Sequence, residues 1–519
     1  MDSDSIRQLI GSLPPAHQCT LRETHISWVI LCGDFAYKIK KPVNFDFLDF
    51  STVEKRRHYC NEELRLNRRF APGLYLAVIP ITRTAQELQF DGSGEIVDYA
   101  VKMQRFDESQ LLDNIAARGE LDAMLLRAVG KELAGLHAKL PVCNPDPCGS
   151  EPGSPVALRA AIEQNMIQVR QYALRSSELQ QLDIVEHWIL RRYSDLLPVM
   201  KNRVAQGWII DGHGDAHLGN IAMFDGAVQL FDCIEFNPAF RIMDSISEIA
   251  FLSMDIEARG HTQAAHRLLS DYLEYRGDYA GLVLLNLYRC YFAMVRAKVA
   301  LLREPRTNKD IGETPGFVIF RRYLELACSY TQSVPGFVAI THGVSGTGKS
   351  TIAGELVACS GAVRLRSDVE RKRLVGLAPE QRSTLQDKEL LYSTGMTRAT
   401  FARLQVLAGV ILDAGFAVIV DATFLHRRAR DPFRELAHSL ELPFIIVDCL
   451  VEPGQLRQRL IAREDQAHDA SEAGVTVMEG QLREAEPLTA VEQNCRLLVN
   501  TQDPGDELWR EFQQRLLHL

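Results

Sequence analysis

The chain has 519 residues, of which 46% are hydrophobic and 24% are charged, and its formal net charge is −9. A chain of this length exceeds one ordinary domain and can bury sizeable hydrophobic cores, so we expect two or three globular domains. The acidic balance disfavours a non-specific binder of nucleic acid or of a membrane surface, although it leaves room for a local basic pocket.

Signals of secretion and membrane insertion are weak in this sequence. Residues 1–15 are acidic and lack the apolar core of a secretory signal, so we expect none. The long apolar stretch at 279–302 is interrupted by Arg289, Arg296 and Lys298, which favours a buried helix over a membrane span. The eleven cysteines lack the paired spacing of zinc ligands, and we expect them to be reduced in a cytoplasmic protein.

The N-terminal part has the alternating pattern of a sheet. Four strands are predicted, at residues 26–33, 35–41, 75–83 and 96–106. Gly33 and Asp34 supply a hairpin turn between the first two, and a polar, basic helix is expected at 52–71. From about Gln110 the period becomes helical, with long helical stretches expected at 156–203 and 243–302.

Two segments could separate domains. Residues 144–155 are the most turn-rich, but we interpret them as an internal loop because candidate site residues on both sides belong together. Residues 329–337 are the better linker, since a buried strand is expected directly after them. The expected domains are therefore 1–331, with a small lobe at about 20–106 and a large lobe at about 107–331, and 332–519.

The segment GVSGTGKS, residues 343–350, fits the phosphate-loop pattern G-x-x-x-x-G-K-[ST] between an expected strand and an expected helix. Glycines let backbone N–H groups turn toward phosphate oxygens, and the helix N-terminus adds a favourable potential. Lys349 is expected to reach the β- and γ-phosphates and Ser350 to ligate Mg²⁺. The expected nucleotide-binding residues are Gly343, Ser345, Gly346, Thr347, Gly348, Lys349, Ser350 and Thr351.

Four polar residues downstream of this loop suit phosphoryl transfer. Asp368 follows a second strand and could accept a proton from an acceptor hydroxyl. Asp421 ends the apolar strand FAVIVD, where it could hold Mg²⁺ through water. Arg459 and Arg463 share one helical face and could close over the phosphates, although surface salt bridges explain them equally well.

On these motifs, residues 337–519 resemble the P-loop kinase family whose members include polynucleotide kinase, chloramphenicol phosphotransferase and the zeta-toxin-like kinases. The resemblance implies an α/β P-loop NTPase fold with a parallel sheet flanked by helices. It also implies Asp368 as the acceptor base or positioning group, and Arg459 and Arg463 as residues of a lid.

A second box, HGDAHLGN at residues 213–220, is built differently. Asp215 could take or orient a hydroxyl proton, while Asn220 could ligate Mg²⁺. Asp232 ends the following strand, where a second metal-binding acid is expected. Lys38, in the second strand of the hairpin, could hold phosphate, and Glu63 in the following helix could pair with it.

Neighbouring residues leave the Lys38–Glu63 assignment open. Lys40 and Lys41 compete with Lys38, and Lys40 has the same strand parity. Glu62 competes with Glu63 in the same manner. No G-x-G-x-x-G precedes Lys38, so the segment RETHISW must cover the phosphates in another way or cover them poorly.

Other polar residues near the box have simpler interpretations. We interpret His213 as a hydrogen-bonded loop histidine rather than a base. His217 could ligate a metal, but a lone histidine in a polar loop usually does not. Asp244, Glu248 and Asp255 do not require a polycation site, because a solvated helix face explains them equally well.

The stretches HGDAHLGNI, LFDCIEFN and LAGLHA (133–138) resemble the aminoglycoside phosphotransferase family, over about residues 20–300. The resemblance implies a bilobal, α+β, protein-kinase-like fold, with Asp215 as catalytic acid-base and with Asn220 and Asp232 holding magnesium. It places the hinge beside adenine near VKMQRF, which includes Met103. Together the two modules resemble bacterial fusions of such a domain with a P-loop kinase-like ATPase domain.

We therefore expect a bifunctional, ATP-dependent phosphotransferase with Mg²⁺ as cofactor and small hydroxylated molecules as acceptors. One alternative is that only one site is catalytic and the other module is regulatory or ligand-binding. Another is a toxin-like or stress kinase that modifies a protein, a nucleotide-sugar or an RNA end. Neither a membrane nor a nucleic acid is expected as partner, whereas the acceptor, the oligomeric state and ATP against GTP stay open.

Overall fold

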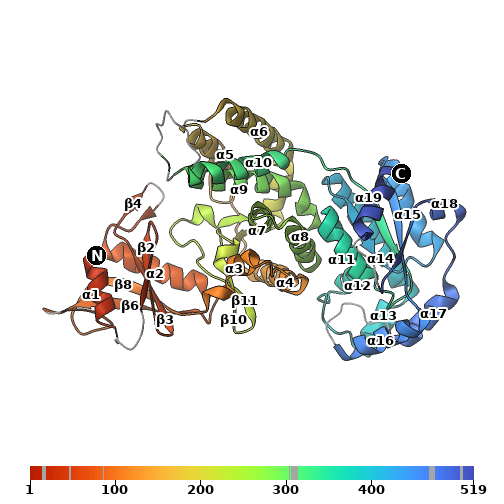
Figure 1. Ribbon diagram of the computed structural model, residues 1–519, viewed down its shortest axis with the longest axis horizontal. Coiled ribbons are helices and arrows are strands. Elements are labelled where there is room, and N and C mark those ends of the chain that lie inside the picture. Colours follow the sequence, from red (N-terminus) through yellow and green to blue (C-terminus); the bar gives the residue numbers. More distant parts are fainter. Residues whose placement is uncertain are drawn as a thin grey trace. The chain divides into compact units, whose positions relative to one another are not determined.

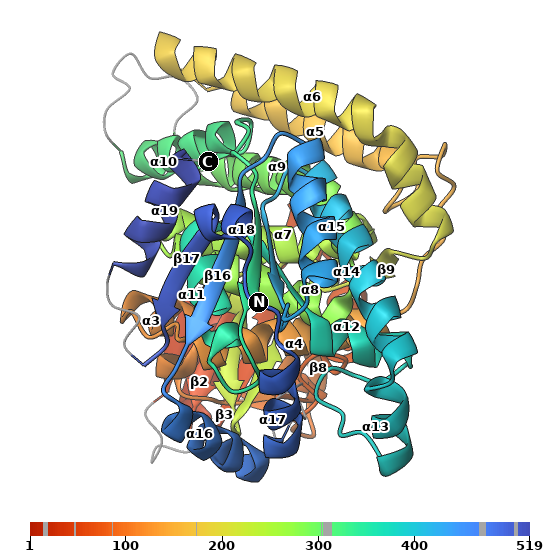
Figure 2. The same ribbon diagram turned by 90° about the vertical axis from the view of Figure 1, so that its right-hand side faces the viewer.

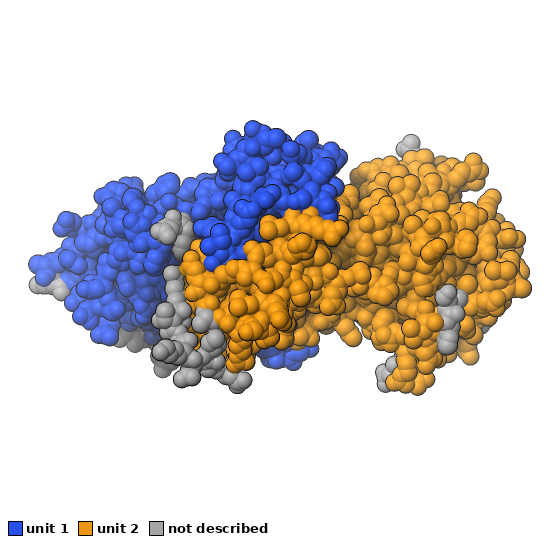
Figure 3. All heavy atoms as spheres, turned by 90° about the horizontal axis from the view of Figure 1, so that it is seen from above, with its two compact units in different colours: residues 1–121, 139–167, 193–255 blue, residues 122–138, 168–192, 256–519 orange. Residues whose placement is uncertain are grey.

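The computed structural model describes residues 1–13, 19–45, 48–85, 87–172, 174–302, 304, 314–466, 474–502 and 507–518. Two compact units are distinguished in it (Figure 3). Unit 1 comprises residues 1–121, 139–167 and 193–255, and unit 2 comprises residues 122–138, 168–192 and 256–519. Residue 331 lies inside unit 2, so the division into units does not test the domain boundary predicted there, which stays a prediction.

Unit 1 contains a six-stranded antiparallel sheet with the order β1-β2-β3-β8-β6-β7 (Figure 1). Its strands are β1 (Thr20–Glu23), β2 (Ser27–Cys32), β3 (Phe35–Lys40), β6 (Tyr75–Arg83), β7 (Leu88–Phe90) and β8 (Glu95–Gln104). The four strands predicted from alternation are thereby confirmed as β2, β3, β6 and β8. The predicted hairpin turn at Gly33 and Asp34 joins β2 to β3, and Gly33 has the positive φ of 58° that this turn requires.

One helix covers each face of this sheet. The helix α1 (Ser3–Gly11) places Ile6 and Leu9 against the face that carries Trp28 and Ile39. The predicted polar helix is α2 (Val53–Asn67), which starts at the N-cap Thr52 and packs against β6 and β8 on the other face. Alternation along β3 therefore turns Lys38 and Lys40 toward the α2 side.

Short elements complete unit 1 and carry the box at 213–220. They are β4 (Asn44–Phe45), β5 (Leu48–Asp49), η1 (Glu108–Gln110), α3 (Leu112–Ala117), β9 (Ile209–Asp211), η2 (Leu218–Asn220), β10 (Ile221–Phe224), β11 (Ala227–Leu230), η3 (Pro238–Phe240) and β12 (Ile242–Asp244). The pairs β4–β5, β9–β12 and β10–β11 are antiparallel. Three helices have two or more residues in each unit: α5 (Pro155–Val169), α6 (Ser176–Ala205) and α7 (Ser245–Ala258).

Unit 2 contains a five-stranded parallel sheet with the order β14-β15-β13-β16-β17. Its strands are β13 (Val338–His342), β14 (Val363–Arg366), β15 (Val418–Asp421), β16 (Phe444–Leu450) and β17 (Arg496–Asn500). The helices α11 (Lys349–Ser360) and α19 (Leu508–His518) pack on one face, and α14 (Thr394–Asp413) and α15 (Arg427–Ser439) on the other (Figure 2). Chain order reverses on either side of β13, and ligands of such sheets bind at the carboxyl ends of the strands beside this point.

The remaining helices of unit 2 precede the first strand of this sheet in the chain or lie between its strands. They are α4 (Ala123–Lys139), α8 (Thr262–Arg276), η4 (Tyr279–Gly281), α9 (Leu282–Leu301), α10 (Pro315–Ser329), α12 (Ser367–Leu374), α13 (Leu385–Leu391), α16 (Pro453–Gln466), α17 (Val475–Glu484) and α18 (Ala490–Asn494). The apolar stretch at 279–302 forms the buried helix α9, as predicted, with Arg289 next to Glu257 at 3.4 Å. In the described part of the chain no helix is long and apolar enough to cross a membrane.

The prediction that all eleven cysteines are reduced is wrong for one pair. Cys19 and Cys32 form a disulfide, with their Cα atoms 4.3 Å apart. The register of β1 on β2 pairs Thr20 with Leu31, so the preceding and following residues face each other across the hairpin. The spacing of the two cysteines did not reveal this disulfide, because they come together only when β1, which begins after Cys19, pairs with β2. The other nine cysteines form no disulfide within the described residues.

Candidate active sites

A group of five charged residues in unit 1, here the lysine–carboxylate cluster, consists of Lys38, Lys40, Glu63, Asp232 and Glu235. The Nζ of Lys38 lies 2.8 Å from Oε1 of Glu63 and also binds Oδ1 of Asp232. The Nζ of Lys40 lies 2.6 Å from Oε2 of Glu63 and also binds Oε1 of Glu235. Fully buried Glu63 therefore holds both lysines, which share one face of β3.

Exposure separates the two lysines that the sequence left as alternatives. The Lys40 side chain is 1% exposed, whereas that of Lys38 is 13% exposed and reaches Asp232, which is 45% exposed. Lys38 is therefore the lysine placed to meet a ligand, and Lys40 is enclosed by two acids. The other competitors lie elsewhere, since Lys41 binds Glu23 at 2.6 Å and Glu62 binds Arg65 at 2.7 Å.

Burial and ion pairing set the protonation of this cluster. Desolvation lowers the pKa of Lys38, but the nearby carboxylates of Asp232 and Glu63 outweigh it and hold the pKa well above its ordinary value. Desolvation raises the pKa of Glu63, and the two lysines more than reverse this. In Glu235 desolvation prevails over Lys40 and the pKa is raised. Both lysines consequently stay charged near neutral pH.

The box at 213–220 presents one carboxylate next to one amide. The Nδ2 of Asn220 donates to Oδ2 of Asp215 and to its backbone carbonyl, both at 3.0 Å. The Asp215 side chain is 38% exposed, and Nε2 of His217 lies 3.6 Å from its Oδ2. Asn220 thus fixes the orientation of a carboxylate that solvent can reach, as a proton acceptor for a substrate hydroxyl requires.

His213 is a structural residue of this loop, which confirms its interpretation from the sequence. Its ring is fully buried, with Nε2 2.9 Å from the carbonyl oxygen of Phe231. Desolvation lowers the pKa of His213, so the ring is neutral near pH 7. The backbone N–H groups of His213 and Gly214 donate to one carboxylate oxygen of Glu248, at 2.8 and 2.7 Å.

The interpretation of Asp244, Glu248 and Asp255 as a solvated helix face is wrong, because all three are buried. Asp244 binds Arg203 with two hydrogen bonds of 2.6 Å. Glu248 holds the start of the 213–220 loop, and Asp255 accepts a hydrogen bond of 3.1 Å from the N–H of Leu218. Buried carboxylates need such partners, and here three of the partners are N–H groups of the box.

The backbone at Asp232 is held in a left-handed conformation with φ 63°. Its N–H donates to the hydroxyl of Tyr75 at 3.0 Å, and the next N–H, of Cys233, donates to Oδ1 of Asn67 at 2.8 Å. These contacts aim the Asp232 carboxylate at Lys38. The predicted hinge residue Met103 lies on β8, where its neighbours across the sheet are Ala36 and Tyr75.

In unit 2 the phosphate loop follows β13, and α11 begins at Lys349. Gly343 and Gly348 have φ angles of 133° and 85°, which side-chain-bearing residues rarely adopt. The Nζ of Lys349 donates to the carbonyl of Val344 at 2.7 Å, and the hydroxyl of Thr347 donates to the same oxygen at 2.9 Å. The lysine therefore lies folded across its own loop.

Asp421 fits the expected metal-binding acid. It ends β15 and is 5% exposed. Among the described residues its Oδ2 has no hydrogen-bond donor, and Nε of Arg366 lies 3.8 Å from it. A buried carboxylate oxygen without a donor suits a hydrated cation. The strand β14 ends at Arg366, earlier than expected, so Asp368 lies in the first turn of α12, where it binds Nη1 of Arg371 at 3.1 Å.

The predicted lid helix is α16. Its Arg459 donates to Oγ1 of Thr501 at 3.0 Å, and Nη1 would lie 3.3 Å from a Cβ added to Gly348. Arg459 therefore lies beside the phosphate loop, and it forms no salt bridge with the residues that the structure describes. The side chain of Arg463 lies outside the described part of the structure.

The structure adds four residues that sequence reasoning missed. Glu235 joins the lysine–carboxylate cluster, and Arg366 stands next to Asp421. Gln481 of α17 accepts a hydrogen bond of 2.7 Å from the N–H of Ser345, and Thr501 follows β17. Only Glu235 had a local signal, as an acid three residues after Asp232.

The donor sets of both sites suit Mg²⁺ bound together with a nucleotide. Asn220 and Asp232 in unit 1, and Ser350 and Asp421 in unit 2, offer the oxygen ligands that Mg²⁺ prefers. In the described residues no group of three or more His, Cys, Asp or Glu side chains is arranged to hold a metal by itself. One or two protein oxygens would thus be completed by phosphates and water, as is usual for Mg²⁺ at nucleotide sites.

Comparisons with known proteins give one family match and several similar solved structures. A family model described as "AAA domain" matches residues 338–488. A choline kinase from Cryptosporidium parvum Iowa II is similar with a TM-score of 0.39 and 11% identity, covering 63% of this chain and 95% of that chain. A gluconokinase from Sinorhizobium meliloti 1021 has a TM-score of 0.24 and 22% identity, covering 36% and 94%. The match to the family model lies within the C-terminal region that the sequence predicted as the P-loop domain.

The relatives by sequence extend over most of the chain. The "Uncharacterized protein Rv2004c" of Mycobacterium tuberculosis H37Rv and the "Uncharacterized protein Mb2027c" of Mycobacterium bovis are each 30% identical over 453 residues. That alignment covers 87% of this chain and 87% of each relative. The chain belongs to the same protein family as these mycobacterial proteins.

Proposed function

We propose that the chain is a bifunctional, ATP-dependent phosphotransferase that transfers phosphoryl groups to small hydroxylated molecules at two separate sites. The observation that carries this proposal is that each unit contains a constellation of its own. Unit 1 has the lysine–carboxylate cluster beside Asp215 and Asn220, and unit 2 has Lys349 and Asp421 around a phosphate loop.

In unit 1, Lys38 would bind a phosphate oxygen in place of its contact with Asp232. Asp215, held by Asn220, would accept the proton of the acceptor hydroxyl as its oxygen attacks the γ-phosphorus, while the bond from that phosphorus to the nucleoside diphosphate breaks. When bound through Asn220 and Asp232, Mg²⁺ supplies positive charge to the phosphate oxygens.

In unit 2, backbone N–H groups of the phosphate loop would surround the phosphates, and Lys349 would turn from the Val344 carbonyl to them. Asp368 is the candidate acceptor-side base, and Arg459 the candidate for neutralising charge on the transferred group. When bound near Ser350 and Asp421, Mg²⁺ neutralises charge on the β- and γ-phosphate oxygens.

The test combines labelled ATP with a metabolite extract and asks which molecules gain phosphate. Asp215→Ala and Lys349→Ala should each abolish a different labelled product, because each removes one site. Two exposed residues outside both sites serve as matched controls, Asp195→Ala and Lys139→Ala. Retention of both products by either site variant would refute the two-site proposal.

A second candidate function, in which unit 1 binds a ligand without transferring phosphate, is favoured by one observation. The connection between β1 and β2 is a tight turn closed by a hydrogen bond of 2.9 Å from Thr24 N–H to the Ser27 carbonyl, with no glycine in it. Nucleotide stoichiometry separates the candidates. If both units transfer phosphate, the wild type binds two nucleotides per chain and Lys349→Ala binds one. If unit 1 only binds a ligand, the wild type binds one nucleotide and Lys349→Ala binds none.

A further inference from the structure

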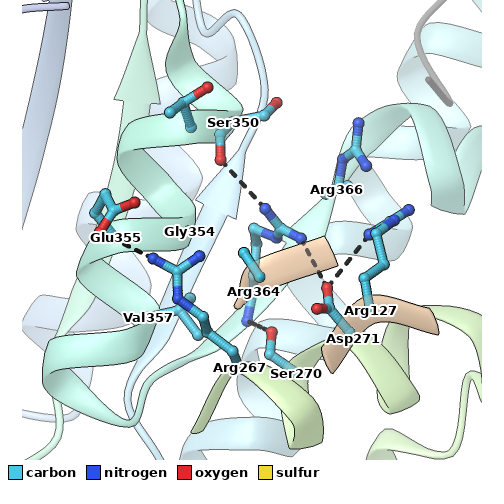
Figure 4. Close-up of a pocket in the computed structure, with 12 residues that line it drawn as sticks. Arg127, Arg267, Ser270, Asp271, Ser350, Gly354, Glu355, Val357, Arg364 and Arg366 are labelled. Atoms are coloured by element: carbon cyan, nitrogen blue, oxygen red, sulfur yellow. Dashed lines mark hydrogen bonds and ion pairs between the residues drawn. The ribbon is translucent and has the colours of Figure 1, made fainter. Parts of the chain in front are cut away.

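Within unit 2, the helix α8 packs against α11, which follows the phosphate loop, and against the edge strand β14 (Figure 4). His266 of α8 lies with Nδ1 2.8 Å from the carbonyl of Ala358 in α11. The hydroxyl of Ser270 accepts a hydrogen bond of 3.2 Å from the N–H of Arg364 in β14. A helix that precedes residue 331 in the chain is thus part of the surroundings of the P-loop site.

The last turn of α8 carries a buried acid, Glu274, which is bound by three arginines. Its carboxylate oxygens lie 3.1 Å from Arg127 of α4, 2.9 Å from Arg364 and 3.1 Å from Arg366. The Glu274 side chain is 1% exposed. Desolvation raises the pKa of Glu274, but Arg366, Arg364 and Arg127 outweigh it and bring the pKa to about 2. The group is therefore an anion at any physiological pH.

Two of these arginines also contact the candidate Mg²⁺ ligands Ser350 and Asp421. Arg364 donates through Nη1 to the carbonyl of Ser350 at 3.2 Å, at the start of α11 (Figure 4). Arg366 has its Nη1 on Glu274, while its Nε lies 3.8 Å from Oδ2 of Asp421. The Arg366 guanidinium is therefore shared between a close acid, Glu274, and a more distant acid, Asp421.

We propose that Glu274 is a positioning residue of the P-loop site, acting through Arg364 on Ser350 and through Arg366 on Asp421. By holding Arg366, Glu274 prevents this arginine from closing onto the Asp421 carboxylate, which stays accessible to a hydrated cation. By holding Arg364, it fixes the first turn of α11. The inference rests on the proposed function of unit 2 and makes α8 a required part of that site.

The physical consequence is a competition for Asp421. If Glu274 loses its charge, Arg366 still has the Asp421 carboxylate 3.8 Å away, and opposite charges in a buried setting attract strongly. An Asp421 carboxylate engaged by arginine binds Mg²⁺ less well. Partners that orient a metal-binding group from behind typically change metal affinity by about 10- to 100-fold when they are mutated.

The experiment uses the full-length chain, a fluorescent ATP analogue and a Mg²⁺ titration. At each Mg²⁺ concentration, the part of the binding signal that depends on Lys349 is obtained by subtracting the same chain carrying Lys349→Ala. Glu274→Gln should raise the Mg²⁺ midpoint of this signal by about tenfold. An unchanged Mg²⁺ midpoint in folded Glu274→Gln would overturn the inference.

Glu178→Gln is the matched control, since Glu178 is another buried acid of unit 2 and binds Arg321 of α10 at 2.7 Å. It should leave the Mg²⁺ midpoint unchanged whatever it does to the melting temperature. An equal midpoint shift in Glu178→Gln would reduce the effect to general destabilisation and contradict the inference.

If Glu274→Gln does not fold, Glu274→Asp decides, because it keeps the charge among the arginines and only withdraws it by one methylene. A midpoint raised by about two- to fivefold is then expected, and an unchanged midpoint would overturn the inference. Wild type without any Lys349-dependent binding would refute the proposed function of unit 2 and the inference together. An unchanged Glu274 variant beside an active wild type refutes the inference alone.

Discussion

The two candidate sites place their charges by different means. In unit 1, side chains on strands and a helix do so, and acids alternate with lysines from Asp232 through Lys38, Glu63 and Lys40 to Glu235. In unit 2, glycines in left-handed conformations shape the backbone of one short loop. Removing a side chain should therefore damage the first site most, and adding a side chain should damage the second most.

The largest effect is expected for Lys40→Met in unit 1. Glu235 would then be a buried acid without a cation, and loss of one partner of a buried pair costs about 3–5 kcal/mol of unfolding free energy. The control is Lys38→Met, which should cost less because Asp232 is solvated and Glu63 keeps Lys40. Denaturant unfolding measures the difference, and equal costs would contradict the distinction between an enclosed and a ligand-facing lysine.

Lys38→Met should nevertheless be the more damaging of the two for activity. The folded variant loses the cation that meets the phosphates, so the product that depends on Asp215 should disappear. The same labelled-ATP assay reports this. Full activity of folded Lys38→Met would show that Lys40 carries the role instead.

Gly343→Ala tests the backbone-built site of unit 2. Its φ of 133° is unfavourable for alanine, and the added Cβ would lie 2.8 Å from the carbonyl oxygen of Cys449. We expect a loss of about 2–3 kcal/mol and of Lys349-dependent nucleotide binding. Gly395→Ala is the matched control, because it lies on α14 with no atom within 4 Å of the added Cβ. That change should be neutral or stabilising by about 0.5 kcal/mol.

The difference between the sites also explains what could be predicted from sequence. The phosphate loop lies within eight consecutive residues, so its motif and its flanking strand and helix were readable before the structure. The strands that carry Lys40 and Asp421 followed from alternation and apolar runs. In unit 1 the site residues, from Lys38 to Asp232, lie in separate segments of the chain. Only the order of these segments along the chain suggested that they form one site.

What was missed depends on packing between distant segments. Glu274 and Arg366 are ninety-two residues apart in the chain, and no local pattern links an acid at the end of one helix to an arginine at the end of a strand. Nothing in the sequence indicated that Glu248 and Asp255 are buried. Acids on a helix usually mark its solvated face, whereas the helix that carries these two acids is buried on all sides.

Acid stability should sharpen the comparison further, because the pKa values of two buried acids, Glu492 in unit 2 and Glu235 in unit 1, are shifted in opposite directions. In unit 2, desolvation raises the pKa of Glu492, but its hydrogen bonds from Arg430 and Thr489 bring the pKa to about 2. A depressed carboxyl pKa contributes stability that is present above its ordinary value of 4.5 and lost as the pH falls toward 2. In unit 1, by contrast, desolvation raises the pKa of Glu235.

We expect hydrogen exchange in β16 and β17 to accelerate as the pH falls from 4.5 toward 2, after correction for the intrinsic rate. Glu492→Gln should flatten this dependence and cost about 2 kcal/mol above pH 5. The exposed acid Glu435 on α15 provides the control, Glu435→Gln. If exchange in Glu492→Gln accelerates at low pH as much as in the wild type, other carboxylates cause the loss of stability.

The smallest effect is expected for His217→Ala, which asks whether this histidine is a ligand or a loop cap. Its Nδ1 accepts a hydrogen bond of 3.0 Å from the N–H of Gly219, at the start of the turn that ends in Asn220. A lost cap costs about 1 kcal/mol, so transfer that depends on Asp215 should fall by less than about tenfold. The Mg²⁺ dependence of that transfer should not move, because the cap supports Asn220 only through the backbone. A raised Mg²⁺ midpoint in His217→Ala would instead make His217 a metal ligand and remove the cap as its explanation.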